Sequence, residues 1–349
     1  MDPLRHHGDV DASPGLLDFA VNVRGAAPPA WLRERLVTAL DDLARYPSAA
    51  HDAEARAAVA ARHGRDPEEV LVLAGSAEGF ALLPALRPRL AAVVHPGFTE
   101  PEAALRAAGV PVQRVFTVAA DGHRLRPAAV PAEADLVVVG NPTNPTAVLH
   151  PAATLRALRA PGRVVLVDEA FADAVPGEAE SVAGEPGFLV FRSLTKTWAL
   201  AGLRAGYALG ASDVLARLAA PRPPWPVSTP ALEAVIACSA PAAVAEAERA
   251  ARDLERQRAE QVAALAAVPG VAVLPGRAPF LLLRLPDGRG EEVRHALRVA
   301  GIAVRRGDTF PGLGPDHLRV AVRDAAAVGR LTTALAAALA EARAGDDAA

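Results

Sequence analysis

Apolar and polar positions divide the chain into a regular middle region and two less regular flanks. Between residues 70 and 209, short apolar runs alternate with turns and with segments of helical spacing. The runs are 70–74, 91–94, 110–115, 136–139, 164–167, 188–191 and 205–209. Because most are continuous and rich in valine and leucine, they are typical of strands buried on both faces. The pattern therefore predicts an α/β domain with a mainly parallel sheet.

The flanking regions predict different elements. Residues 1–15 look like an extended arm in which Gly8 permits a tight turn, with a disordered terminus as the alternative. Residues 16–23 are half alternating, and the later segments combine helical spacing with short apolar runs. The segment 230–267 predicts a long helix with a break near Pro241. We divide the chain into three parts: 1–40, an arm with part of a small domain; 41–235, a large domain; and 236–349, a small α+β domain.

Composition narrows the class of partner. Acidic residues (40) nearly balance basic ones (37), and the arginines are scattered among carboxylates, which argues against nucleic acid or an anionic membrane as a partner. A small-molecule ligand is expected. Cys238 is the single cysteine and predicts a buried small residue, and the dispersed histidines predict no metal site. The chain shows neither a signal sequence nor an apolar stretch of membrane-spanning length, so we expect a cytoplasmic protein.

Lys196 is the only lysine among the 37 basic residues. Arginine keeps its charge at working pH, whereas a desolvated lysine can lose a proton and attack a carbonyl. Chance survival of one lysine is the alternative. The residues that directly follow the predicted strands favour a functional lysine over chance survival, because ligands of open α/β sheets bind at the carboxyl ends of the strands. These positions are Gly75, Ser76, Phe98, Asn141, Asn144, Asp168 and Ser193, with Lys196 itself.

A reactive lysine on such an edge suits a carbonyl cofactor that bears a phosphate, and pyridoxal phosphate fits. Lys196 would hold its aldehyde covalently. Asp168 would pair with the ring nitrogen, with a helix cap as the alternative. Asn144 would donate to the phenolic oxygen, although Asn-Pro pairs also form ordinary turns. Phe98 would stack on the ring, or belong to the core.

The cofactor phosphate needs several donors at one place. Ser76 and Ala77 open a predicted helix whose first N–H groups can face an anion. Ser193 adds a hydroxyl and Arg204 a positive charge. We expect these four residues to anchor the phosphate.

Four stretches resemble the class I/II aminotransferases of pyridoxal-phosphate fold type I. They are A-G-S-A-E at 74–78, N-P-T-N-P-T at 141–146, V-D-E-A-F at 167–171 and S-L-T-K…L-A-G-L-R-A-G-Y at 193–207. The resemblance implies a seven-stranded, mainly parallel sheet between helices, a smaller α+β domain and a homodimer. It also implies that Tyr46 reaches the cofactor phosphate of the partner subunit.

Two branches of that family are similar to this chain: histidinol-phosphate aminotransferase and the threonine-phosphate decarboxylase of cobalamin biosynthesis. H-H-G-D at 6–9, L-D-F-A-V-N-V at 17–23 and the segment 301–323 resemble the decarboxylase pattern, and Phe171 suits it. By resemblance, Arg319 clamps the substrate carboxylate and Arg305 meets a substrate phosphate.

The chain departs from the decarboxylase pattern at His7, Arg24, Pro101 and Ala147. We expect His7, Arg24 and Pro101 to lie near an amino-acid or amino-acid-phosphate substrate rather than near the cofactor. The motifs favour decarboxylation of O-phospho-L-threonine to (R)-1-amino-2-propanol phosphate. The alternative is an aminotransferase that acts on histidinol phosphate or another amino acid. A regulatory cofactor-binding module is disfavoured because no helix-turn-helix segment is added to the two-domain pattern.

Overall fold

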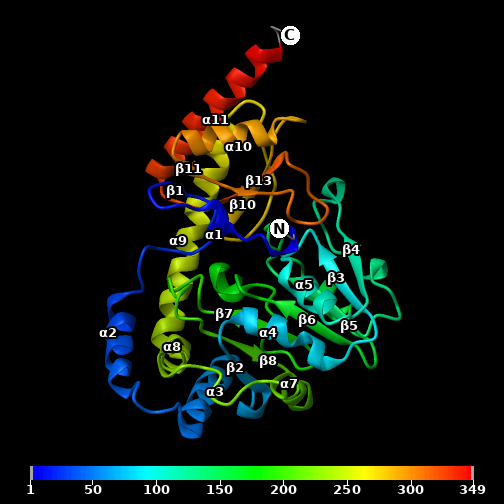
Figure 1. Cartoon of the computed structure of the whole chain (residues 1–349), viewed down its shortest axis with the longest axis vertical. Coiled ribbons are helices and arrows are strands. Elements are labelled where there is room, and N and C mark those ends of the chain that lie inside the picture. The colour runs from blue at the N-terminus through cyan, green and yellow to red at the C-terminus, as the bar shows by residue number, and fades with distance from the viewer. Residues whose placement is uncertain (1–2, 347–349) are drawn as a thin grey trace.

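The computed structural model describes residues 3–346 and has a large lower unit and a smaller upper one (Figure 1). The large unit is built on a seven-stranded sheet. Its strands, in spatial order, are β2 (Val70–Leu73), β8 (Gly206–Leu209), β7 (Leu189–Ser193), β6 (Val164–Asp168), β5 (Leu136–Gly140), β3 (Ala91–His95) and β4 (Val112–Phe116). In this sheet, β8 runs in the direction opposite to the other six strands. The predicted α/β fold with a mainly parallel sheet is confirmed.

Helices cover both faces of this sheet, which explains the continuous apolar runs. Along β6, Val165 and Val167 face one core, whereas Leu166 faces the other. The helices around the sheet are α2 (Ala30–Ala39), α3 (Ala49–His63), α4 (Ser76–Leu82), α5 (Glu100–Ala107), α6 (Ala152–Arg156), α7 (Ser212–Ala219) and α8 (Thr229–Ser239). Short 3-10 turns lie between them, at Leu40–Asp42, Pro67–Glu69, Leu83–Leu86, Ala119–Asp121, Pro127–Ala129, Ala172–Ala174 and Pro176–Glu178. Both faces of the sheet are therefore withdrawn from water, and its carboxyl edge is left for a ligand.

The small unit packs an antiparallel sheet against helices. Its strands are β12 (Arg305–Arg306), β13 (His317–Ala321), β10 (Phe280–Arg284) and β9 (Ala272–Val273), and its helices are α10 (Gly290–Val299) and α11 (Ala325–Asp346). A separate parallel pair joins β1 (Leu17–Asp18) to β11 (Ile302–Ala303). The short run at 302–305 suggests one strand by its sequence, but the chain leaves one sheet after Ala303 and enters another at Arg305.

Helix α9 (Pro241–Ala266) connects the two units and is the long yellow helix of Figure 1. Ala243 and Ala247 belong to the core of the large unit, whereas Leu265 belongs to the core of the small one. The predicted break at Pro241 is present as a 74° bend between α8 and α9. Among the described helices, none is by itself long and apolar enough to span a membrane, and only this bent pair reaches that length and composition together.

The first residues of the chain contribute to both units. Phe19 lies in the core of the small unit, but Leu32 of α2 lies in the core of the large one. Before them, a 3-10 turn (Pro3–Arg5) and α1 (Gly8–Asp11) form an arm. A boundary at residue 40 therefore separates α2 from the unit against which it packs.

Candidate active site

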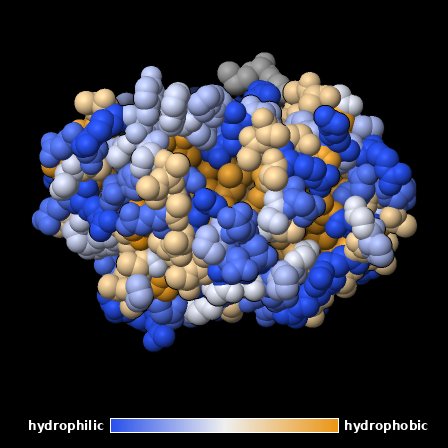
Figure 2. All heavy atoms as spheres, turned by 90° about the horizontal axis from the view of Figure 1, so that it is seen from below, coloured by the Kyte–Doolittle hydropathy of each residue, from blue (hydrophilic) through white to orange (hydrophobic). Residues whose placement is uncertain are grey.

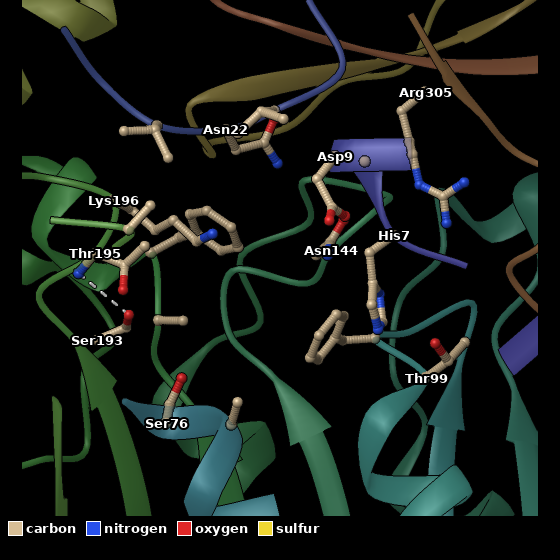
Figure 3. A pocket seen from close by; sticks show the side chains of 18 of the residues that line it. His7, Asp9, Asn22, Ser76, Thr99, Asn144, Ser193, Thr195, Lys196 and Arg305 are labelled. Atoms are coloured by element: carbon tan, nitrogen blue, oxygen red, sulfur yellow. Dashed lines mark hydrogen bonds between the residues drawn. The ribbon is translucent and has the colours of Figure 1, made fainter. Parts of the chain in front are cut away.

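A cavity of about 440 Å³ opens at the carboxyl edge of the large sheet and is lined by residues of both units and of the arm. It brings together most of the residues predicted from the sequence: Ser76, Ala77, Phe98, Asn144, Asp168, Ser193, Lys196, Arg204, Arg305, Arg319 and His7. These residues come from distant parts of the chain. The polar clusters at the strand ends therefore form one site, as Figure 3 shows for those it labels.

Asp168 ends β6 and reaches into the cavity. Its Oδ1 accepts a hydrogen bond from the backbone N–H of Ala170 at 3.2 Å. Burial and the negative charge of the neighbouring Glu169 raise the pKa of Asp168 to about 7, although the positive charge of Lys196 opposes this rise. Such a carboxyl group can hold a proton against a ring nitrogen near neutral pH.

Lys196 follows β7 and points into the same cavity (Figure 3). Burial, together with the positive charges of Arg319 and Arg204, lowers the pKa of Lys196 to about 8, although Asp168 and Asp9 oppose this shift. About a tenth of the amine is therefore neutral at pH 7, far more than for an ordinary lysine. A neutral, desolvated amine is the reactive form toward a carbonyl group.

One end of the cavity offers donors for an anion. Helix α4 begins at Ser76, directly after Gly75, whose φ of 78° is in the left-handed region. A Cβ at Gly75 would lie 2.7 Å from Nη2 of Arg204, but this end of a flexible side chain can move aside, so the backbone conformation is what favours glycine here. The first N–H groups of a helix have no intrahelical partners. With the hydroxyls of Ser76 and Ser193, they give this end the chemistry of a phosphate site.

Arg319 lies at the other end, on β13. Its Nη1 donates to Oδ1 of Asn144 at 2.7 Å, and its Nη2 donates to the backbone oxygen of Ala20. Its Nε–H is buried and has no hydrogen-bond partner among the residues that the structure describes. Burial lowers the pKa of Arg319 and the neighbouring Arg305 lowers it further, so its charge lacks full compensation. The side chain is ready for an anionic ligand.

Arg305 lies opposite Arg319 in the β12–β13 pair and anchors the N-terminal arm. Its Nη2 donates to the backbone oxygen of His6 at 2.7 Å, and its Nη1 lies 3.3 Å from Oδ2 of Asp11. On the opposite wall, Nε2 of His7 is 2.6 Å from Oε1 of Glu100. The arm thus contacts both units across the cavity.

Two predicted residues lie elsewhere. Tyr46 is 74% exposed and stacks on Trp225 with ring centroids 4.2 Å apart. Arg24 donates its backbone N–H to the oxygen of Lys196 at 2.9 Å, but its side chain is exposed in a neighbouring groove beside Asp253. Arg24 also lines a second, small cavity together with Asn22, Phe171 and Lys196, so its place near substrate stays a prediction.

Sequence reasoning missed several residues that line the cavity, among them Asn22, Thr99 and Phe310. Asn22 is 6% exposed, and its Oδ1 has no hydrogen-bond partner in the described part of the chain. A polar residue inside the apolar run 17–23 was the available signal. Thr99 and Phe310 carry no such signal, since loop residues of these types are common. Within the described residues, no group of three or more histidine, cysteine or acidic side chains could hold a metal ion.

We predict that Asp168→Asn stabilises the cofactor-free protein at neutral pH. The folded pKa of Asp168, about 7, exceeds the value near 4 of an unfolded aspartate, so between these values the folded state binds more protons. Its contribution to the free energy of unfolding therefore falls as pH rises from about 4 to about 7. The melting temperature of the variant should exceed that of the wild type at pH 8 by more than at pH 5. Asp41→Asn, at an exposed position, should show no such trend; equal shifts at both pH values for Asp168→Asn would contradict the account.

The cavity fits a cofactor with an aldehyde, a basic ring nitrogen and a phosphate. The orphan Nε–H of Arg319 and the unpartnered Oδ1 of Asn22 additionally mark a place for a second ligand. Oδ1 of Asn144 accepts the hydrogen bond from Arg319, so Nδ2 of Asn144 remains available as a donor. The donors and acceptors of the site therefore match both a cofactor and an anionic substrate.

Comparisons with known proteins agree with this chemistry. Residues 15–335 match the family model for aminotransferases of class I and II. The chain is 56% identical to a histidinol-phosphate aminotransferase of Mycobacterium tuberculosis (strain ATCC 25618 / H37Rv) over 321 residues, which cover 91% of this chain and 87% of the relative. It is 33% identical to the threonine-phosphate decarboxylase of Salmonella typhimurium over 334 residues, which cover 92% and 90%. The crystal structure of histidinol-phosphate aminotransferase from Clostridium acetobutylicum shares the fold, with a TM-score of 0.83, 22% identity and coverage of 92% and 98%.

Proposed function

This chain belongs to the class I and II aminotransferase family, whose cofactor is pyridoxal phosphate, and we propose that it transfers an amino group between histidinol phosphate and a 2-oxo acid. One observation carries the chemistry: a lysine of lowered pKa and a carboxyl group of raised pKa share a cavity with an anion site at each end. The 56% identity to a histidinol-phosphate aminotransferase supports the substrate.

Each end of the cavity has a role in this proposal. The cofactor supplies an aldehyde for attachment and a ring that withdraws electrons from the bond broken at the substrate carbon. Lys196 holds the cofactor and, once released, moves the proton at that carbon with its Nζ. Asp168 keeps the ring nitrogen protonated, and Nδ2 of Asn144 donates to the phenolic oxygen. Arg319 orients the carboxylate of the oxo acid, and Arg305 meets the substrate phosphate.

Decarboxylation of O-phospho-L-threonine is the second candidate. The segment H-H-G-D, which resembles the decarboxylase pattern, folds into the cavity, and a relative that carries out this named reaction is 33% identical over 92% of the chain. The motifs alone favoured this reaction. Because the identity to the aminotransferase is higher, we rank decarboxylation second.

We also propose a homodimer. Apolar side chains around α2 remain more than half exposed in the single chain: Val37, Leu40, Leu43, Tyr46 and Trp225. Figure 2 shows the face seen from below, where apolar residues gather between charged ones. Burying such side chains against a second copy would withdraw them from water. In this arrangement Tyr46 would reach the cofactor phosphate of the partner subunit.

Covalent attachment of pyridoxal phosphate to the cofactor-free protein should become faster as pH rises and then level off near pH 8. The reactive neutral form of Lys196 grows about tenfold per pH unit below a pKa of about 8. Stopped-flow absorbance gives the rate. Binding of pyridoxamine phosphate, which needs no free amine, is the control and should lack this rise. A rate that still climbs tenfold per unit between pH 9 and 10 would show an ordinary lysine.

The two candidate reactions differ in their need for a second substrate. Beyond one molecule per active site, the purified holoenzyme should consume histidinol phosphate only when a 2-oxo acid is present, with one amino acid formed for each further molecule consumed. Release of carbon dioxide from O-phospho-L-threonine without any oxo acid would instead support the second candidate. Comparing initial rates of both at equal enzyme concentration tests the proposal.

A further inference from the structure

The N-terminal arm is fixed against both walls of the cavity. The hydroxyl of Thr99 in the large unit donates to the backbone oxygen of Leu4 at 2.6 Å. On the side of the small unit, Nη1 of Arg298 donates to the oxygen of Asp11 at 3.1 Å. A Cβ at Gly8 would lie 2.6 Å from the oxygen of Ala20, so the arm passes this segment with no space for a side chain. The position of the next residue, Asp9, is therefore determined by the fold.

The two aspartates of α1 have different surroundings. Asp11 is 8% exposed, and its Oδ2 lies 3.2 Å from Nε2 of His6 and 3.3 Å from Nη1 of Arg305. Asp9 remains exposed and has no hydrogen bond or ion pair within residues 3–346. Asp11 thus neutralises Arg305 and secures the arm, while the carboxylate of Asp9 is left for another use.

Asp9 lines the cavity between its two reactive ends. Figure 3 shows its carboxylate directed into the cavity, with Lys196 on one side and Arg305 on the other, above Asn144. The charge of Asp9 is close enough to Lys196 to raise the pKa of that amine. A substrate that reaches from the cofactor on Lys196 to Arg305 would therefore pass this carboxylate.

We infer that Asp9 selects the substrate by accepting a hydrogen bond from an N–H group of the substrate side chain. This inference rests on the proposed function and specifies its substrate class: phosphorylated amino compounds that carry a hydrogen-bond-donating nitrogen ring, such as the imidazole of histidinol phosphate. In the proposed function Arg204 binds the cofactor phosphate, and Arg305 and Arg319, which line the same cavity, bind the anionic groups of the substrates. Asp9 gives the same cavity an acceptor for a neutral or cationic ring.

The same carboxylate disfavours other side chains. A purely aliphatic substrate offers no donor, so it gains nothing from Asp9 and must still displace water from it. A further anionic group at this place would be repelled. Selection therefore comes from one added attraction and one added cost.

The test compares two ligands on Asp9 variants. Histidinol phosphate and 2-aminopropyl phosphate share the amino phosphate frame, but only the first has a ring. Binding is measured by isothermal titration calorimetry on holoenzyme whose cofactor has been fixed to Lys196 by borohydride, so that no turnover occurs. Asp9→Asn should lower the affinity for histidinol phosphate by about tenfold or more, as expected for loss of one charge-assisted hydrogen bond. The affinity for 2-aminopropyl phosphate should change by less than about twofold. Asp9→Ala should change the two affinities in the same way.

Val10→Ala is the matched control, because Val10 is the next residue of the arm and is 52% exposed. It should leave both affinities unchanged. Equal losses for both ligands in Asp9→Asn, no loss for either, or a wild type that binds both ligands equally well would overturn the inference. Ring selection that depends on Asp9, in an enzyme that transfers no amino group, would keep the inference and refute the proposed reaction. Amino transfer by the wild type, together with unaltered ring selection in Asp9→Asn, would keep the proposed reaction and refute the inference.

Discussion

Replacing Lys196 with alanine is expected to lower turnover by about 10⁴-fold or more and to abolish covalent retention of the cofactor. Lys196 is the only lysine of the chain, so no second amine of this kind can substitute. The same Nζ both holds the cofactor and moves the substrate proton, which makes the loss larger than that of a binding contact. Single-turnover kinetics with histidinol phosphate measure the first effect. Mass spectrometry after borohydride treatment measures the second, with the added mass on Lys196 in the wild type alone.

Lys196→Arg separates nucleophilicity from charge. Arginine keeps the positive charge beside Asp168 but does not deprotonate at working pH. It should therefore fail as fully as alanine, while the melting temperature of the cofactor-free protein stays closer to that of the wild type. Activity near the wild-type level in Lys196→Arg would show that only the charge matters and would remove the central role of this residue.

Arg319→Ala is expected to reduce kcat/KM for the oxo acid by about 10²- to 10³-fold, mainly through a higher KM. A charge-assisted, partly desolvated pair contributes about 3–4 kcal/mol, which corresponds to this range at about 1.4 kcal/mol per factor of ten. The unpaired Nε–H of Arg319 is the atom that the ligand would satisfy. Steady-state kinetics with the oxo acid varied give the two constants separately.

Two variants control this prediction. Arg284→Ala removes an exposed arginine from β10 of the same sheet and should leave kcat/KM unchanged. Arg319→Lys keeps a charge but loses the planar fork and its bond pattern to Asn144 and Ala20, so we expect only partial recovery. Near-normal kcat/KM in Arg319→Ala would mean that another cation orients the carboxylate.

Local patterns predicted the large unit closely because its strands are short, apolar and buried on both faces. The run at 164–167 and the observed β6 (Val164–Asp168) differ by one residue. Parallel strands place their carboxyl ends on one edge, and this geometry brought Asp168, Asn144 and Lys196 together before any contact was known. That part of the site followed from topology.

Long-range contacts could not be predicted in the same way. The arm reaches Arg305 from a position almost 300 residues earlier in the chain, and no local periodicity encodes that contact. Likewise, Val304 lies between β11 and β12, so an apparently continuous strand serves two sheets. The position of Arg24 outside the cavity has the same origin, because a backbone bond to Lys196 determines where this segment turns.

The choice between reactions depends on geometry finer than residue type. Decarboxylation and amino transfer differ in which bond of the substrate carbon stands perpendicular to the cofactor ring. In the proposed function, Arg319 and the arm residues would set that angle by holding the anionic groups. Motifs shared by both branches therefore could not separate them, and the order of the two candidates came from the identity to the relatives.

A single competition experiment tests the central proposal most directly. Holoenzyme receives histidinol phosphate, 2-oxoglutarate and O-phospho-L-threonine labelled with ¹³C in its carboxyl group, and all products are followed by NMR. The account predicts that glutamate appears as histidinol phosphate disappears, while the label remains in phosphothreonine. Labelled carbon dioxide together with 1-amino-2-propanol phosphate, and no glutamate, would contradict it.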